Sequence, residues 1–215
     1  MRYRFFTYMM VAGILIISGC AGVRHQETPG RQPASQQEMG YREVFESWTR
    51  EGRIYDGLST KLISEATFKS SEFRQAFAEE YARLYKLEPP EYDKLVLDQQ
   101  KAAADYNDFV LAAYVAEKKW DDFSKKTSMW KIYLTRDHVE QIRPLEIRKL
   151  NKNDPVKDYF YPYVTTWKSI YLVRFPAHDP KTGNRFMDDT QDALSLIMTS
   201  VLGSVEFKWN INHKQ

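Results

Sequence analysis

The sequence predicts an α+β fold, in which N-terminal helices are followed by a mainly antiparallel β-sandwich. Two observations carry this prediction. Apolar residues recur every three or four positions in the first half of the folded part, and they alternate with polar residues in the second half. We therefore expect a helical region at 41–105 and a β-rich domain at 106–215. Strand number and spacing make an immunoglobulin-like arrangement our first expectation for the sandwich.

The helical region contains one clear amphipathic helix. Its apolar face consists of aromatic residues at helical spacing: Phe73, Phe77, Tyr81 and Tyr85. Ser70 or Ser71 is placed to cap its N-terminus, and Pro89-Pro90 ends it and opens a third helix to about residue 104. The segment 41–62 also has apolar residues at helical spacing, so we expect a helix there that is interrupted by glycines.

The second half consists of short apolar or alternating runs that are separated by turn signals. The predicted strands lie at 109–115, 130–134, 139–150, 170–175, 194–198 and 205–209. The run at 139–150 changes parity at Pro144, which favours an edge strand or a bulge.

The N-terminus has the pattern of an export signal. Arg2 and Arg4 precede an apolar run that ends at Ile17. The run is too short for a membrane-spanning helix, which needs about 20 apolar residues. It is followed by Ser18-Gly19-Cys20, and Ile17 to Cys20 resembles the lipobox of bacterial lipoproteins: an aliphatic residue, two small residues and a cysteine. The resemblance covers residues 1–20 only.

This resemblance implies that residues 1–19 are a signal peptide and that the thiol of Cys20 is lipidated. The chain is then anchored in the bacterial cell envelope, facing the periplasm. Ala21 follows the cysteine where an aspartate would favour the inner membrane, so by analogy with enterobacterial sorting the outer membrane is favoured. Residues 20–40 comprise the lipidated cysteine and a stretch rich in Gly, Pro, Ser and Gln, which we interpret as a flexible tether.

The composition narrows the classes of partner. The chain has 31 basic and 29 acidic side chains, and removal of residues 1–19 takes away Arg2 and Arg4, which leaves 29 of each. A neutral chain of mixed charge argues against nucleic acid as a partner. We expect the membrane, through the lipid, and an envelope protein as partners.

No motif for catalysis, cofactor binding or metal binding stands out. His138 and His178 lack the paired spacing of a zinc site, and the sequence has no G-x-S-x-G and no phosphate-binding glycine motif. Cys20 is the only cysteine, so its acylation leaves no thiol for catalysis. The acidic cluster at 188–192 is more typical of a solvated loop or a helix cap than of a calcium site. We expect no catalytic residue, no cofactor and no metal.

The most unusual local feature is an aromatic run before the predicted strand at 170–175. Its candidate binding residues are Tyr159, Phe160, Tyr161, Tyr163 and Trp167. One alternating strand cannot bury all of these rings, so some are expected to face a groove or a partner. The alternative is a loop whose rings fill one end of the sandwich core.

The sequence thus predicts a membrane-anchored envelope lipoprotein whose domain binds or scaffolds another envelope component without catalysis. Two alternatives stay open. One is a cell-envelope hydrolase with a site assembled from dispersed carboxylates. Examples of such carboxylates are Asp121, Asp122, Asp188 and Asp189. The other is a small-ligand carrier, which predicts an apolar pocket beneath the aromatic run.

Overall fold

The computed structural model describes residues 36–136, 140–151, 154–187 and 193–211. Residues 34–215 form one compact unit. The elements in chain order are α1 (Gln36–Ser47), β1 (Thr49–Asp56), β2 (Ser59–Phe68), α2 (Ser71–Tyr85), α3 (Pro89–Asp105), β3 (Tyr106–Val115), the 3-10 helix η1 (Lys118–Trp120), β4 (Lys131–Arg136), β5 (Glu140–Ile142), β6 (Glu146–Lys149), α4 (Pro155–Phe160), β7 (Ser169–Pro176), β8 (Ala193–Ser200) and β9 (Gly203–Asn210).

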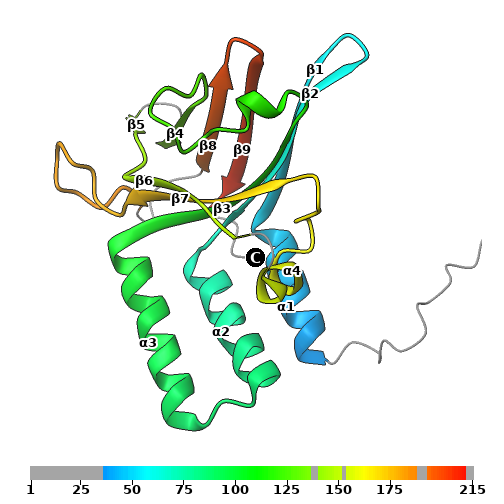
Figure 1. The fold of residues 1–215 in the computed structure, drawn as a ribbon. Coiled ribbons are helices and arrows are strands. Elements are labelled where there is room, and N and C mark those ends of the chain that lie inside the picture. Colours follow the sequence, from blue (N-terminus) through cyan, green and yellow to red (C-terminus); the bar gives the residue numbers. More distant parts are fainter. Residues whose placement is uncertain (1–35, 137–139, 152–153, 188–192, 212–215) are drawn as a thin grey trace, which may run out of the picture. The chain divides into compact units, whose positions relative to one another are not determined.

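The strands form two sheets (Figure 1). The order is β1-β2-β3-β7-β6 in the five-stranded sheet and β5-β4-β8-β9 in the four-stranded sheet, and the neighbours pair antiparallel throughout. The predicted α+β class with a mainly antiparallel sandwich is therefore confirmed. The immunoglobulin-like arrangement is not confirmed.

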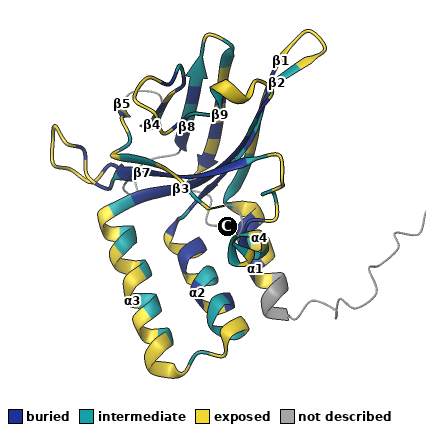
Figure 2. Ribbon diagram, in the orientation of Figure 1, coloured by how far each residue is buried: buried dark blue, intermediate teal, exposed yellow. Residues whose placement is uncertain are grey.

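The larger hydrophobic core lies between the two sheets. Alternate residues of β3 face it, namely Phe109, Leu111 and Ala113, because side chains alternate between the faces of a strand. Buried side chains of β8 and β9 meet them from the four-stranded sheet: Leu194, Leu196, Met198, Val205, Phe207 and Trp209. Figure 2 shows β3 and β8 as mostly buried, and in β9 buried residues alternate with exposed ones.

A second core covers the other face of the five-stranded sheet, where the helices lie (Figure 1). Its buried members are Tyr41, Phe45, Phe73, Val110, Phe160, Tyr161 and Ile170. The hydroxyl of Tyr41 in α1 donates to the carbonyl of Phe160 in α4 at 2.8 Å, which ties the first helix to the last. The five-stranded sheet is thus the middle layer, with the four-stranded sheet on one side and helices on the other.

The two long helices differ in how deeply they are buried. As predicted, Ser70 caps α2, and its hydroxyl accepts a hydrogen bond from the backbone N–H of Phe73 at 3.1 Å. Phe73 and Arg74 are among the residues that α2 buries. In contrast, α3 has no buried side chain, and in Figure 2 it is exposed or half-buried along its length.

The prediction was wrong after residue 48, because the segment 49–68 is a β-hairpin and not a helix. The two-residue loop between its strands is Gly57-Leu58, and a glycine at the first loop position is a hairpin signal that the helical spacing of nearby residues obscured. Gly57 has a φ of 57°, which glycine adopts without strain. Gly52 lies in β1 where a Cβ would come within 3.0 Å of Val205 in β9, so this glycine permits close packing between the sheets.

The helical and β regions are also not separate along the chain, since β1 and β2 precede α2 and join the sheet that contains β3. The strands predicted after residue 105 are all present, and the run at 139–150 is divided into β5 and β6 on either side of Pro144. The predicted tether extended to Gly40, but α1 begins at Gln36. Residues 1–35, with the predicted signal and Cys20, lie outside the described residues. Within the described part, none of the helices combines the length and hydrophobicity needed to cross a membrane.

Candidate functional site

A pocket lies on the helix-facing side of the five-stranded sheet, between the start of α2, α4 and strands β6 and β7. Its volume is about 220 Å³. Its lining is apolar except for three basic side chains and one tyrosine: Lys69, Phe77, Val110, Arg148, Leu150, Val156, Lys157, Phe160, Tyr161 and Leu172. We call it the basic pocket.

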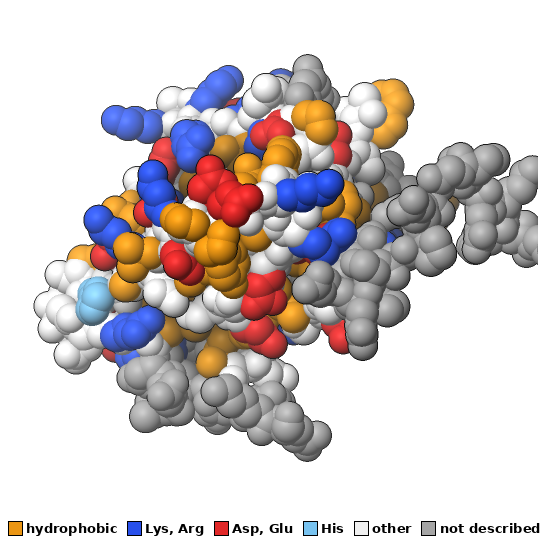
Figure 3. All heavy atoms as spheres, turned by 90° about the horizontal axis from the view of Figure 1, so that it is seen from below, with side chains coloured by type: hydrophobic (Ala, Val, Ile, Leu, Met, Phe, Trp, Pro, Cys, Tyr) orange, Lys and Arg blue, Asp and Glu red, His pale blue; other side chains and the backbone are white. Residues whose placement is uncertain are grey.

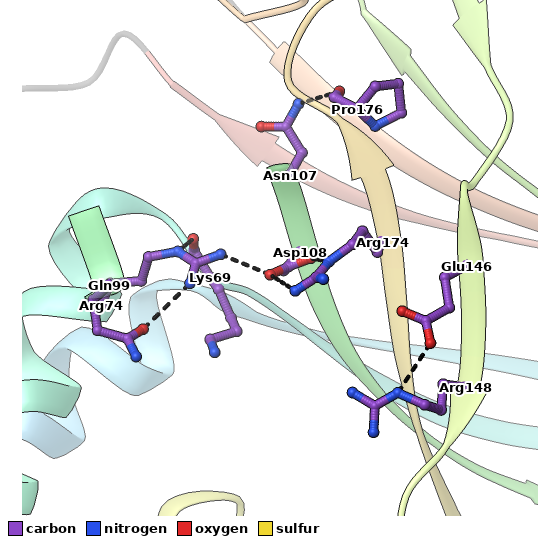
Figure 4. Close-up of polar contacts among 9 residues, drawn as sticks. All are labelled: Lys69, Arg74, Gln99, Asn107, Asp108, Glu146, Arg148, Arg174 and Pro176. Atoms are coloured by element: carbon purple, nitrogen blue, oxygen red, sulfur yellow. Dashed lines mark hydrogen bonds and ion pairs between the residues drawn. The ribbon is translucent and has the colours of Figure 1, made fainter. Parts of the chain in front are cut away.

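A buried ion triad stands beside the basic pocket (Figure 4). Asp108, at the start of β3, accepts from Arg74 of α2 at 2.9 Å and from two nitrogens of Arg174 of β7 at 2.8 and 3.1 Å. The side chains of Asp108 and Arg74 are only 2% and 3% exposed. Burial acts to raise the pKa of Asp108, but the hydrogen bonds from Arg174 and Arg74 outweigh it and hold the pKa below its usual value. Asp108 is therefore an anion whose two oxygens are both engaged.

Lys69 links β2 to α2 and is held at its backbone. Its N–H donates to the carbonyl of Asp108 at 2.9 Å, and its carbonyl accepts from Nε of Arg74 at 2.9 Å. Its ammonium lies 5.8 Å from the centre of the Phe77 ring, within the range of a cation–π contact. Burial, with a smaller contribution from Arg74, lowers the pKa of Lys69 to about 8. In Figure 4 the side chains of Lys69 and Arg148 extend to the same side of the triad.

The other two cations of the basic pocket have acidic partners. Arg148 donates to Glu146 at 3.0 Å, and this pair is largely exposed. Lys157 pairs with Asp154 at 3.0 Å. Asp154 also caps α4, since it accepts from the backbone N–H of Val156 at 3.0 Å. The charges of Arg148 and Lys157 are thus partly neutralised by carboxylates. The ammonium of Lys69 instead lies near the ring of Phe77.

The structure brings most of the predicted aromatic residues together in the second core. Phe160 and Tyr161 line the basic pocket and are 1% and 6% exposed. The hydroxyl of Tyr163 contacts the hydroxyl of Thr67 at 2.8 Å. Tyr159 donates to Glu80 of α2.

Trp167 is separate from this group, because 76% of it is exposed. Phe160 and Tyr161 form part of the pocket wall, and they pack with Tyr159 and Tyr163 in the second core. That core lies under the helices and not between the sheets. That these rings bind a partner stays a prediction.

Sequence reasoning missed Lys69, Arg74, Asp108 and Arg174. Their positions in sequence carry no pairing signal, since the triad joins residues that lie 34 and 66 positions apart. The available hint was that Asp108 directly precedes an apolar run, which places a carboxylate on a strand that is buried on both faces.

Of the other carboxylates considered earlier, Asp121 is the best placed. It accepts from Ser169, from Tyr171 at 2.9 Å and from Lys118 at 3.0 Å. Burial acts to raise its pKa, but these hydrogen bonds outweigh the effect and lower it. Asp122 accepts from the hydroxyl of Ser128 at 2.9 Å.

The acidic cluster at 188–192 and His138 lie outside the described residues, and His178 forms an isolated β-bridge with Arg185. Within the described ranges, no group of three or more His, Cys, Asp or Glu side chains is placed to hold a metal ion.

Comparisons with known proteins give a structural likeness. No protein-family model matches the chain, and no curated protein matches it. The chain is similar to a solved structure described as a novel protein of unknown function from Burkholderia pseudomallei K96243. The match has a TM-score of 0.40 and 9% sequence identity, and it covers 81% of this chain and 84% of that chain.

Proposed function

We propose that the protein is a lipid-anchored component of the bacterial cell envelope whose folded domain binds another envelope component without catalysing a reaction. The observation that carries the anchor is the tetrapeptide Ile17 to Cys20 at the end of a short apolar run. Lipidation adds about 0.8 kcal/mol of membrane affinity for each buried methylene, so two or more acyl chains hold the protein without a membrane-spanning helix.

Exposed apolar side chains on the α2–α3 hairpin support the binding role. Leu97 of α3 is 65% exposed and Tyr85 of α2 is 51% exposed. Figure 3, which views the helices from below, shows hydrophobic side chains gathered on this face among acidic and basic ones. Exposed apolar patches mark sites of interaction more often than single apolar residues do.

The anchor is tested by replacing Cys20. In the source bacterium, Cys20→Ala should leave the protein unprocessed or move it out of the membrane fraction, because the thiol that accepts the lipid is gone. Ser18→Ala keeps a small residue in the tetrapeptide and should fractionate like the natural protein. If Cys20→Ala still fractionates as the natural protein does, the lipobox interpretation is wrong.

The binding role is tested by photo-crosslinking in cells from Leu97. Leu58, an exposed apolar residue in the turn between β1 and β2, serves as the matched control. We expect one recurring protein adduct from Leu97 that is absent from Leu58. Identical adducts from both positions, or none from Leu97, would contradict a partner on the α2–α3 hairpin.

A small-ligand carrier is the second candidate function, and the basic pocket favours it. A carrier predicts an apolar pocket beneath the aromatic run, and Phe160 and Tyr161 line such a pocket. The hydrolase alternative has less support. A general acid needs a raised pKa, whereas the carboxylates Asp108 and Asp121 have lowered ones. Burial raises the pKa of Glu65, but this carboxylate forms an ion pair with Lys168.

A further inference from the structure

The charge on Lys69 lacks an acidic partner in the part of the chain that the structure describes. Asp108 is the nearby carboxylate that favours its charged form, but both oxygens of Asp108 are bound by Arg74 and Arg174. Arg74 and Arg174 also act against the ammonium by charge repulsion. Among the described residues, the site therefore holds a half-buried cation that has lost part of its hydration and forms no ion pair.

The surroundings of the basic pocket carry a positive excess. Its cations and those of the triad are Lys69, Arg74, Arg148, Lys157 and Arg174. The carboxylates that pair with them are Asp108, Glu146 and Asp154. Five positive charges against three negative ones favour an anion over a neutral or cationic ligand.

The remaining wall of the pocket is suited to an apolar body. Val110 and Leu172 project from the sheet, and Phe77, Val156 and Phe160 close the pocket from the helices. An engineered apolar cavity of about 150 Å³ binds benzene, so a pocket of about 220 Å³ has room for a single aromatic ring or a short acyl chain.

We infer that the basic pocket binds an organic anion with a compact apolar body, with its carboxylate or phosphate group at the ammonium of Lys69 and its body against the apolar wall. This inference rests on the small-ligand candidate of the proposed function and adds the charge and size of the ligand. Such an anion would supply the counter-charge that Lys69 lacks, and the hydrogen bonds at the Lys69 backbone fix the start of its side chain in advance.

The test is calorimetric titration of the protein that begins at residue 20 and carries Cys20→Ser, so that neither the leader nor a lipid competes for the pocket. Both hydrophobic cores lie between Tyr41 and Trp209, so this chain retains the whole described fold. The ligands are octanoate, 1-octanol with the same chain but no charge, and inorganic phosphate with charge but no apolar body.

We expect octanoate to bind more tightly than 1-octanol or phosphate. Lys69→Met removes the charge and keeps the chain length, and it should weaken octanoate binding at least tenfold, which equals about 1.4 kcal/mol, while 1-octanol is unaffected. Lys101→Met on exposed α3 is the matched control and should bind octanoate as the unsubstituted protein does. Melting curves of both variants verify that they are folded.

The possible failures are distinguishable. If octanoate and 1-octanol bind alike and Lys69→Met changes neither, the pocket takes ligands but the anion inference is wrong. If phosphate binds as tightly as octanoate, the apolar body contributes nothing and that part of the inference is overturned. If none of the three binds, the anion inference is overturned and the small-ligand candidate loses its support, while the anchor and the protein partner remain to be judged by their own experiments.

Discussion

The two faces of the five-stranded sheet differ in chemistry, although the same strands build both. On the sandwich side, β7 presents Tyr171, Val173 and Phe175, and the core between the sheets is made of hydrophobic side chains. On the helix side, β7 presents Leu172 to the basic pocket and Arg174 to the buried triad. One strand therefore contributes to a hydrophobic core with one set of alternate residues and to a charged, hollowed site with the other.

This difference indicates which face defines the fold and which face is available for function. A well-packed apolar core stabilises without leaving room for a ligand. Buried charges add little net stability, because the loss of hydration offsets most of their attraction. The helix side keeps Asp108, Arg74 and Arg174 despite that penalty, and the basic pocket lies on the same side.

The largest effect is expected on the sandwich side. Phe109 is fully buried and contacts the rings of Phe68, Phe175 and Trp209, with centroid distances of 4.9 to 5.8 Å. Phe109→Ala should lower the free energy of unfolding by about 3–5 kcal/mol, because it removes buried surface and leaves a cavity. Chemical denaturation measures this loss. A loss below about 1 kcal/mol would mean that this core is not packed as described.

A smaller loss is expected on the helix side. Asp108→Asn leaves two arginines without their counter-charge and should lower the free energy of unfolding by about 3 kcal/mol. Glu146→Gln, which breaks a largely exposed pair on the same sheet, is the control and should change it by less than about 0.5 kcal/mol.

The pH dependence of the free energy of unfolding tests whether Asp108 stabilises the folded protein as an anion. Because folding lowers the pKa of Asp108, its contribution is present above the pKa of the unfolded chain and is lost as the pH falls through the folded value. The natural protein should therefore lose more stability than Asp108→Asn when both are acidified. Equal loss in both proteins would show that the triad is not the source of this stability.

The smallest expected effect is a stabilisation, in contrast to the two losses above. Lys69→Met should raise the free energy of unfolding at pH 7 by roughly 1 kcal/mol, because the native lysine is a cation that has lost hydration without gaining a carboxylate partner among the described residues. Folding lowers the pKa of Lys69 to about 8, and in the unfolded chain this pKa is about 10.4. The charged lysine therefore destabilises the folded protein fully below pH 8, and this destabilisation disappears as the pH rises to about 10.4. Denaturation curves should show that Lys69→Met raises the free energy of unfolding less at pH 10.5 than at pH 7. A destabilised variant would show that Lys69 has a structural role.

The sequence was a good guide wherever the period of the apolar residues was unambiguous. The period-two runs at β4 and β9 and the helical spacing of α2 led to the right element, and the cap is Ser70, one of the two serines that the sequence offered. The prediction for the segment 49–68 was wrong because its aromatic and aliphatic residues fit both the helical and the strand period. The turn residue Gly57 was interpreted as an interruption of a helix.

The candidate site was only partly predictable. The aromatic run pointed to Phe160 and Tyr161, which line the pocket. The triad was not predictable, because Arg74, Asp108 and Arg174 meet only once α2, β3 and β7 are packed together. Local patterns report which side chains are buried, and they do not report which distant charges are buried together.

The shallow burial of α3 has a consequence for hydrogen exchange. A helix with no buried side chain opens at a free energy well below that of global unfolding, so its amide protons should exchange long before those of β3. Gln99 of α3 accepts from Arg74 at 3.2 Å, and each opening of the helix breaks this contact with the triad. Exchange along α3 therefore reports the free energy of the opening that removes one support from the arginine beside the basic pocket.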